Sequence, residues 1–208
     1  GKQAKIEALR RAHDTYERQH EALWGTFMSG VVSDETVRRA CQQVCVQAQR
    51  IARAPQTWDG EHLARLLAHV ATVVSIRLTR SSWEQGSARV RFRLHPVQVV
   101  TVLRLLGADE PQDEGLWKQT VNAINVFRRR ERASRGPLVN HLVEILTGEG
   151  KSITLGCCAT MLALLGFGVD CASYSKHLSR RDYRAFEQVF KDFGVAEHIR
   201  YSTFEQLV

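Results

Sequence analysis

A glycine-rich segment between two apolar runs constrains the fold of this chain more than any other feature. Residues 146–155 read LTGEGKSITL, with two glycines directly ahead of a lysine and a serine. The preceding run, NHLVEIL at 140–146, predicts a buried strand, and residues 152–165 predict a helix. A glycine loop that joins a strand to a helix exposes consecutive backbone N–H groups, and the helix N-terminus adds positive potential. The segment therefore predicts a cradle for phosphate groups.

The alternation of strand and helix patterns continues after the glycine loop. A strand is predicted over 169–174, a helix over 179–193 and a further strand over 197–203. This order is typical of a parallel sheet with crossover helices, whose ligands bind at the carboxyl ends of the strands. We therefore expect an α/β fold, with residues 147–152 at the binding edge of its sheet.

The part of the chain before residue 80 has helical periodicity. Apolar residues recur at intervals of three and four over 6–23 and over 61–78, and Ser33 begins a second helix that Pro55 ends. This pattern predicts an all-helical N-terminal region at 1–88.

The α/β region is then expected at 89–208. Pro96 begins a short helix there, and Gly107 follows its end. A longer helix is predicted over 116–132.

Charge and cysteine content limit the partners and the compartment. The net charge of +7 is compatible with nucleic acid, anionic lipid or acidic protein, and it selects none of them. The densest basic cluster, at 128–132, lies at a predicted helix end and has no alternating aromatic residues. A solvated helix end is therefore favoured over a nucleic-acid-binding site. Five cysteines without metal-ligand spacing predict reduced, packed thiols and a cytoplasmic protein. The longest apolar run, 153–169, contains three glycines and is short for a membrane span.

The lysine and serine of the loop have distinct expected roles. Lys151 would reach the β- and γ-phosphates of a nucleotide, and the Ser152 hydroxyl would join the Mg²⁺ shell. The general P-loop pattern has glycine six residues before the lysine, where this chain has Ile145. The variant Thr-Gly-x-Gly-Lys-Ser/Thr is the form used by helicase-type motors.

EILTGEGKSITL resembles the first nucleotide motif of the SecA preprotein translocase ATPases, which carry Thr-Gly-Glu-Gly-Lys-Thr. The stretch LALLGFGVDCASYSKHLSRRD, at 162–182, resembles the family's next motif, with Leu178, Arg181 and Asp182 on its Leu, Arg and Asp. Upstream, RLHPVQVV is similar to the family's RHFDVQL and places Arg93 and Gln98 on its Arg and Gln.

The chain also departs from the family pattern. Ser175 and Lys176 replace an Asn and an Asp of the second motif, and residues 108–139 form an insertion between the Gln and the Lys. The acidic pairs of this sequence all precede the glycine loop, whereas the family has an Asp-Glu pair later in its motor domain. The resemblance therefore implies the front half of a divergent first motor domain, with an incomplete P-loop parallel sheet of the helicase-motor type.

The resemblance also implies ligands, site residues and partners. ATP with Mg²⁺ is the expected cofactor, the metal being held through Ser152. The residues expected to bind the nucleotide are Thr147, Gly148, Glu149, Gly150, Lys151, Ser152, Gln98 (which reads adenine), Arg93 and Arg181 (near base and ribose). The implied partners are a polypeptide substrate and an anionic membrane surface or membrane channel, with the protein peripheral to the membrane.

Three function classes stay open at this point. The first is a SecA-like motor that couples ATP hydrolysis to polypeptide translocation or remodelling within a longer chain. The second is a nucleic-acid-translocating helicase-type ATPase, and the third is a SecA-derived, non-catalytic interaction module. No catalytic residue is expected within the 208 residues, because the acidic Mg²⁺ and water motif is missing after the glycine loop.

Overall fold

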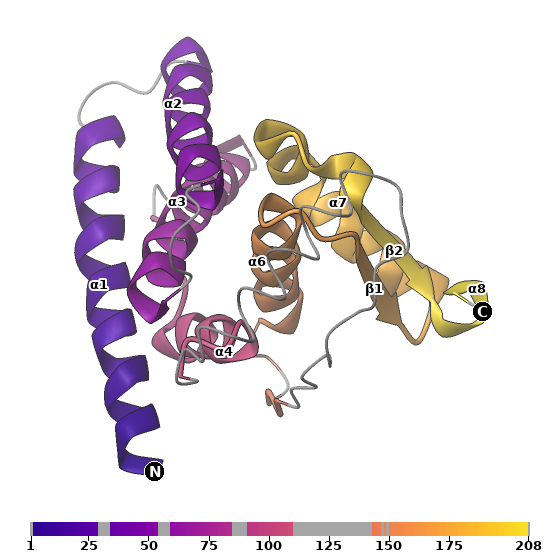
Figure 1. The fold of residues 1–208 in the computed structure, drawn as a ribbon. Coiled ribbons are helices and arrows are strands. Elements are labelled where there is room, and N and C mark those ends of the chain that lie inside the picture. The colour runs from indigo at the N-terminus through magenta and orange to yellow at the C-terminus, as the bar shows by residue number, and fades with distance from the viewer. Residues whose placement is uncertain are drawn as a thin grey trace.

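Three long helices form the first part of the fold in the computed structural model of this chain (Figure 1). The structure describes residues 2–28, 34–53, 59–84, 91–109, 143–146, 148 and 150–207. The long helices are α1 (Lys2–Met28), α2 (Asp34–Arg53) and α3 (Gly60–Glu84). They confirm the predicted helical character of the N-terminal region. Ser33 and Pro55, the predicted helix boundaries, lie outside the described residues.

Three further helices follow, and local sequence signals fix their ends. They are α4 (Pro96–Leu105), α6 (Lys151–Leu164) and α7 (Lys176–Phe193). Pro96 occupies the first turn of α4, where its missing N–H costs nothing, and Gly107 adopts a positive φ of 76° just after the helix. Gly194, with φ of 68°, ends α7 in the left-handed conformation that glycine adopts most readily. These predicted boundaries are confirmed.

The described sheet has two parallel strands, β1 (Val169–Ser173) and β2 (Ile199–Thr203). Their register runs from Val169 opposite Ile199 to Ser173 opposite Thr203, and α7 makes the crossover between them. The short 3₁₀ helix η1 (Ala196–His198) precedes β2, and α8 (Phe204–Leu207) follows it. The predicted strands at 169–174 and 197–203 are therefore confirmed to within a few residues.

The strand predicted ahead of the glycine loop is not found. Residues 143–146 carry no regular secondary structure, Glu144 is exposed, and the Leu146 side chain is 68% exposed. An apolar run becomes a buried strand only when neighbouring strands and helices cover both of its faces, and within the described residues Glu144 and Leu146 are not covered. The prediction of a strand is wrong for these four residues, so the described part of the chain is mostly helical with a small parallel sheet.

Part of the predicted insertion is not described. The helix expected over 116–132, the arginine cluster within it and all of 108–139 except Ala108 and Asp109 lie outside the described residues.

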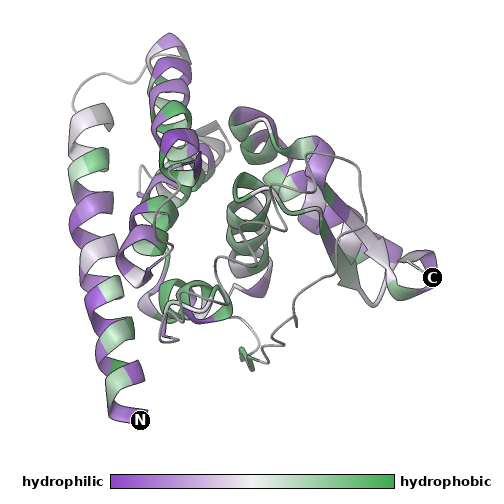
Figure 2. Cartoon of the chain, in the orientation of Figure 1, coloured by the Kyte–Doolittle hydropathy of each residue, from purple (hydrophilic) through white to green (hydrophobic). Residues whose placement is uncertain are grey.

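Helix α6 lies between the N-terminal helices on one side and the α7, β1 and β2 layer on the other (Figure 1). Apolar residues predominate along it (Figure 2). At Gly156 the chain packs so closely that an added Cβ would lie 2.5 Å from the Phe186 ring of α7. A larger residue there would push α6 and α7 apart, so this glycine allows the contact that holds both helices around the site.

Polar contacts tie the N-terminal helices to α7. The Arg77 guanidinium of α3 donates two hydrogen bonds of 2.7 Å to the carboxylate of Asp192. The Gln49 amide of α2 donates to the Phe193 carbonyl at 3.0 Å.

One cluster of buried apolar residues runs from α1 through α6 to α7, and all five cysteines are buried. No helix in the described part of the chain is long and apolar enough to cross a membrane.

Candidate nucleotide-binding site

The glycine loop reaches α6 through two residues with positive φ. Gly148 has φ of 90°, and Gly150, the N-cap residue of α6, has φ of 73° and ψ of 43°. The Gly150 carbonyl accepts the amides of Ile153 at 3.0 Å and Thr154 at 3.1 Å. Among the described residues, no backbone carbonyl accepts the amides of the first two helical residues, Lys151 and Ser152. They are therefore available to an anion at the positive end of the helix dipole.

Lys151 is the first residue of α6 and is exposed. It has no ion-pair partner among the residues that the structure describes. Thr147 and Glu149, two further predicted site residues, lie outside those residues. A cation without a neutralising carboxylate, next to free amide donors, suits a phosphate group.

Gln98, on the first turn of α4, lies against the glycine loop although 53 positions separate it from Lys151 in the sequence. Its side chain is buried, and its Oε1 accepts the His95 amide at 2.9 Å, which caps α4. The other end of the amide faces Gly150, where an added Cβ would lie 2.3 Å from the Gln98 Nε2. Glycine is thus required at 150 both by its backbone conformation and by the side chain packed on it.

Ser152, Arg181 and Asp182 form a second cluster, where the first turn of α6 meets α7. The Ser152 hydroxyl donates to the Asp182 Oδ1 at 3.0 Å. The Arg181 guanidinium donates to the same carboxylate oxygen through Nε at 2.9 Å and Nη2 at 2.7 Å, and Nη2 lies 3.4 Å from the Ser152 Oγ. The structure therefore brings together two predicted site residues and adds an acid, Asp182, that was not among them.

Arg93 lies elsewhere, against α1. Its guanidinium forms an ion pair with Glu17, and its side chain is 45% exposed. The same Glu17 carboxylate lies 3.8 Å from the His13 ring of α1. The structure thus places Arg93 in a contact with the N-terminal helices, while Gln98, five residues later, contacts the glycine loop.

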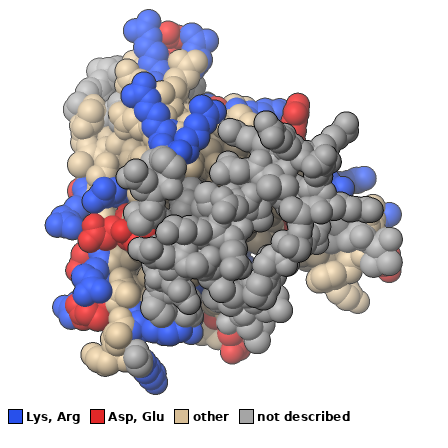
Figure 3. All heavy atoms as spheres, viewed as in Figure 1, with Lys and Arg blue, Asp and Glu red and all other residues tan. Residues whose placement is uncertain are grey.

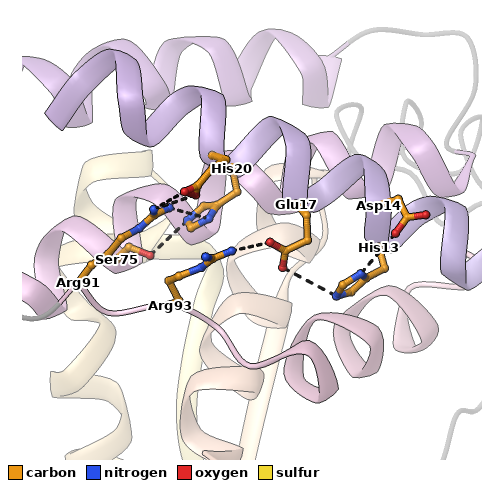
Figure 4. A network of polar contacts seen from close by, with 8 residues as sticks. His13, Asp14, Glu17, His20, Ser75, Arg91 and Arg93 are labelled. Carbon is orange, nitrogen blue, oxygen red and sulfur yellow. Dashed lines mark hydrogen bonds and ion pairs between the residues drawn. The ribbon is translucent and has the colours of Figure 1, made fainter. Parts of the chain in front are cut away.

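A buried histidine network adjoins Arg93 (Figure 4). His20 of α1 is completely buried, and its ring stacks on Tyr16 with centroids 5.4 Å apart. Arg91 donates to the His20 Nδ1 at 3.2 Å, so the neutral ring carries its proton on Nε2 and donates it to the Ser75 Oγ, 3.4 Å away. Burial, helped by the charges of Arg91 and Arg93, lowers the pKa of His20 to about 4. The ring is therefore neutral at pH 7.

Arg91 anchors this network through three different contacts. Besides His20 it binds both carboxylate oxygens of Glu21, at 2.9 and 2.8 Å, and its guanidinium lies 4.3 Å from the centre of the Trp24 ring. Burial acts to raise the pKa of Glu21, but the hydrogen bonds and charge of Arg91 outweigh it and hold the pKa below its ordinary value. The network fixes the segment at 91–95 from which α4 and Gln98 begin.

The spacing of residues in the sequence does not predict the contacts of Arg91 and Asp182. Glu21 and Arg91 are 70 positions apart, and Ser152 and Asp182 are 30 apart. The only available signal was the position of Asp182 next to Arg181 in the motif quoted above.

A comparison with known families agrees with this geometry. Residues 136–206 match the family model of the SecA DEAD-like domain. The match contains the glycine loop, α6, β1, α7 and β2, whereas Arg93 and Gln98 lie outside it. Searches of curated proteins and of solved structures find no match to the chain. The chain is therefore similar to the SecA DEAD-like domain over residues 136–206.

Proposed function

We propose that this chain binds ATP at residues 147–152 and forms the nucleotide-binding part of a SecA-like motor ATPase. The observation that carries the proposal is the placement of Gln98 against Gly150, at the start of α6. The side chain proposed to read the base thereby lies next to the helix end proposed to bind phosphate. The helix end lies within residues 136–206, which match the SecA DEAD-like family.

The residues present suit a magnesium nucleotide. The amides at the start of α6 and the Lys151 ammonium would hold the phosphates, and the Ser152 hydroxyl would hold Mg²⁺. The Gln98 amide carries a donor and an acceptor group, the types that match the N7 and N6 groups of adenine. The resemblance implies Arg181 near base and ribose, whereas its guanidinium lies 3.4 Å from the Ser152 Oγ, at the proposed Mg²⁺ end of the site. When bound, Mg²⁺-ATP would supply the phosphoanhydride bond whose hydrolysis drives such motors.

We further propose that these residues bind the ATP whose hydrolysis, in a longer chain, drives polypeptide translocation or remodelling. The partners would be a polypeptide substrate and an anionic membrane surface or channel. Residues 1–208 are not expected to hydrolyse ATP by themselves, because no Asp-Glu pair follows the glycine loop in this sequence. Such pairs position Mg²⁺ and water in motors of this class.

A nucleic-acid motor is the second candidate, since the net charge is +7. On the face shown in Figure 3, lysines and arginines over α1 are interspersed with acidic residues. That mixture does not form the continuous basic track that a nucleic-acid backbone requires. Stimulation of ATP turnover by RNA or DNA, and not by an unfolded polypeptide, would favour this candidate.

Isothermal titration calorimetry of Mg²⁺-ATP tests the proposal. Lys151→Ala should weaken binding on the order of 10- to 100-fold, because hydrogen bonds to charged groups contribute about 1.5–3 kcal/mol. Lys191→Ala is the matched control, since it removes an exposed lysine of α7 that pairs with Glu187. Equal affinity in the unsubstituted protein and Lys151→Ala would contradict a phosphate cradle. No ATP binding by the unsubstituted protein would instead favour the third function class, a SecA-derived, non-catalytic interaction module.

A further inference from the structure

Asp182 is the one carboxylate that contacts a predicted cofactor-binding hydroxyl in the described part of the chain. Its side chain is 15% exposed, and its Oδ1 accepts the Ser152 hydroxyl at 3.0 Å. Arg181, which is 59% exposed, donates twice to the same oxygen. The positive charge of this guanidinium stabilises an ionised carboxylate in a partly buried position beside the N-terminus of α6.

The direction of the serine hydrogen bond decides what the hydroxyl can offer. A hydroxyl has one proton and two lone pairs. Because the proton of Ser152 is donated to Asp182, its oxygen presents lone pairs elsewhere. Arg181 Nη2, at 3.4 Å, makes only a long contact with that oxygen. One lone pair of the Ser152 oxygen is then left for a cation. A freely rotating hydroxyl would point a lone pair toward that cation only part of the time.

We propose that Asp182 is a positioning residue that holds the Ser152 hydroxyl in the orientation that binds Mg²⁺. This inference rests on the proposed ATP-binding function. It assigns to the second motif an acid that acts through the serine of the first, and it separates the roles of two neighbours. Asp182 orients the serine, and Arg181 balances the charge of Asp182.

A purely structural role for Asp182 makes a different prediction. If the Ser152–Asp182 bond only ties α6 to α7, its loss would change nucleotide affinity equally with and without Mg²⁺. The packing of Gly156 on Phe186 already joins these helices, so they do not depend on that bond. The Mg²⁺ dependence of affinity therefore distinguishes positioning from structural support.

The experiment measures ATP affinity by calorimetry in Mg²⁺ and in EDTA, and takes the ratio of the dissociation constant in EDTA to that in Mg²⁺. Asp182→Ala should reduce this ratio about tenfold, the factor expected from losing one charge-assisted hydrogen bond. Asp182→Asn, which keeps an acceptor oxygen, should reduce it less, and it serves as the test if the alanine variant does not fold. Asp170→Ala, which breaks the exposed pair with Arg200 on the strands, should leave the ratio unchanged.

A double-mutant cycle with Ser152→Ala completes the test. Since Asp182 acts through Ser152, the double variant should have the same ratio as Ser152→Ala. Additive losses, or an unchanged ratio in Asp182→Ala, would overturn the positioning role while ATP binding stands. Failure of the unsubstituted protein to bind ATP would instead overturn the proposed function, and this inference with it.

Discussion

The histidine network between α1 and residue 91 and the glycine loop at α6 use polar residues in opposite ways. In the network, Arg91 is matched by Glu21, Trp24 and His20, and the His20 ring is neutral and fully buried. At the loop, Lys151 is exposed and has no ion-pair partner among the described residues. Polar groups that satisfy one another contribute to stability, whereas unmatched ones beside a helix N-terminus are available to a ligand. The comparison therefore predicts that substitutions in the two regions will affect different measurements.

Arg91→Ala should have the largest effect on stability. It leaves Glu21 without its bidentate partner and His20 without a donor, and it removes the contact with Trp24. We expect a loss of about 2–3 kcal/mol in the free energy of unfolding, measured by urea denaturation. Arg65→Ala, which breaks an exposed pair with Glu61 on α3, should cost less than about 0.5 kcal/mol.

The folded Arg91→Ala protein should still bind ATP and should lose much less affinity than Lys151→Ala, because Arg91 contacts only the segment ahead of α4 and not the glycine loop. A loss of affinity as large as that of Lys151→Ala would remove the distinction between the two regions.

The network should also make stability depend on acid. The folded-state pKa of His20, about 4, lies below its unfolded value near 6.5, so the unfolded chain takes up a proton first as the pH falls. Its contribution is therefore complete above pH 6.5 and is lost progressively toward pH 4. We expect a loss of about 2 kcal/mol between pH 7 and pH 5, measured as a shift in urea unfolding.

His20→Gln should flatten most of this pH dependence. Burial also lowers the pKa of His69, against the opposing hydrogen bond with the Arg65 carbonyl, so a smaller dependence of the same sign should persist. An unchanged profile in His20→Gln would show that other groups control the acid response.

Gln98 links the two regions, and its substitution should change selectivity. Gln98→Glu keeps the acceptor that caps α4 at His95 and loses the donor for adenine N7. We expect the preference for ATP over GTP to fall by about 1.5 kcal/mol, roughly tenfold in the ratio of dissociation constants. Gln42→Glu, on an exposed position of α2, controls for the added charge. Equal affinity of the unsubstituted protein for both nucleotides would show that Gln98 does not read the base.

A pair of glycine substitutions should give the smallest effect. Gly150→Ala and Gly107→Ala each place a Cβ on a left-handed residue, which costs about 1 kcal/mol of stability. Only at 150 would the new Cβ meet the Gln98 amide; nothing lies within 4 Å at 107. Gly150→Ala should lose more stability in urea than Gly107→Ala, because only its Cβ meets a buried side chain, and only Gly150→Ala should also bind ATP more weakly. Equal affinities in the two variants would contradict the contact between Gln98 and the loop.

Local signals in the sequence predict both ends of α4 and the end of α7. Pro96, Gly107 and Gly194 act through their own backbone conformations, so their effect on chain direction is visible without a tertiary structure. The strand at 140–146 was predicted from apolar content, and that content does not specify whether neighbours cover the segment. Glu144 and Leu146 are exposed, so the prediction of a strand is wrong for residues 143–146.

The site was predictable where one motif carries it and not where distant segments meet. Gly150, Lys151 and Ser152 follow from the loop pattern. The single Asp182 does not belong to an adjacent Asp-Glu pair, and its contact with Ser152 depends on how α6 packs on α7. Likewise, Arg93 was assigned to the nucleotide from its motif, and no spacing indicated that Glu17 lies beside it.

Amide chemical shifts of isotope-labelled protein during titration with Mg²⁺-ATP test the central claim most directly. We predict shifts at Gly148, Gly150 and Ser152, with smaller ones at Gln98, and none at the Arg91 network. ATP should leave the spectrum unchanged in Lys151→Ala at the same concentrations. Unchanged glycine-loop amides in the unsubstituted protein, or shifts confined to the network around Arg91, would contradict a nucleotide site at the start of α6.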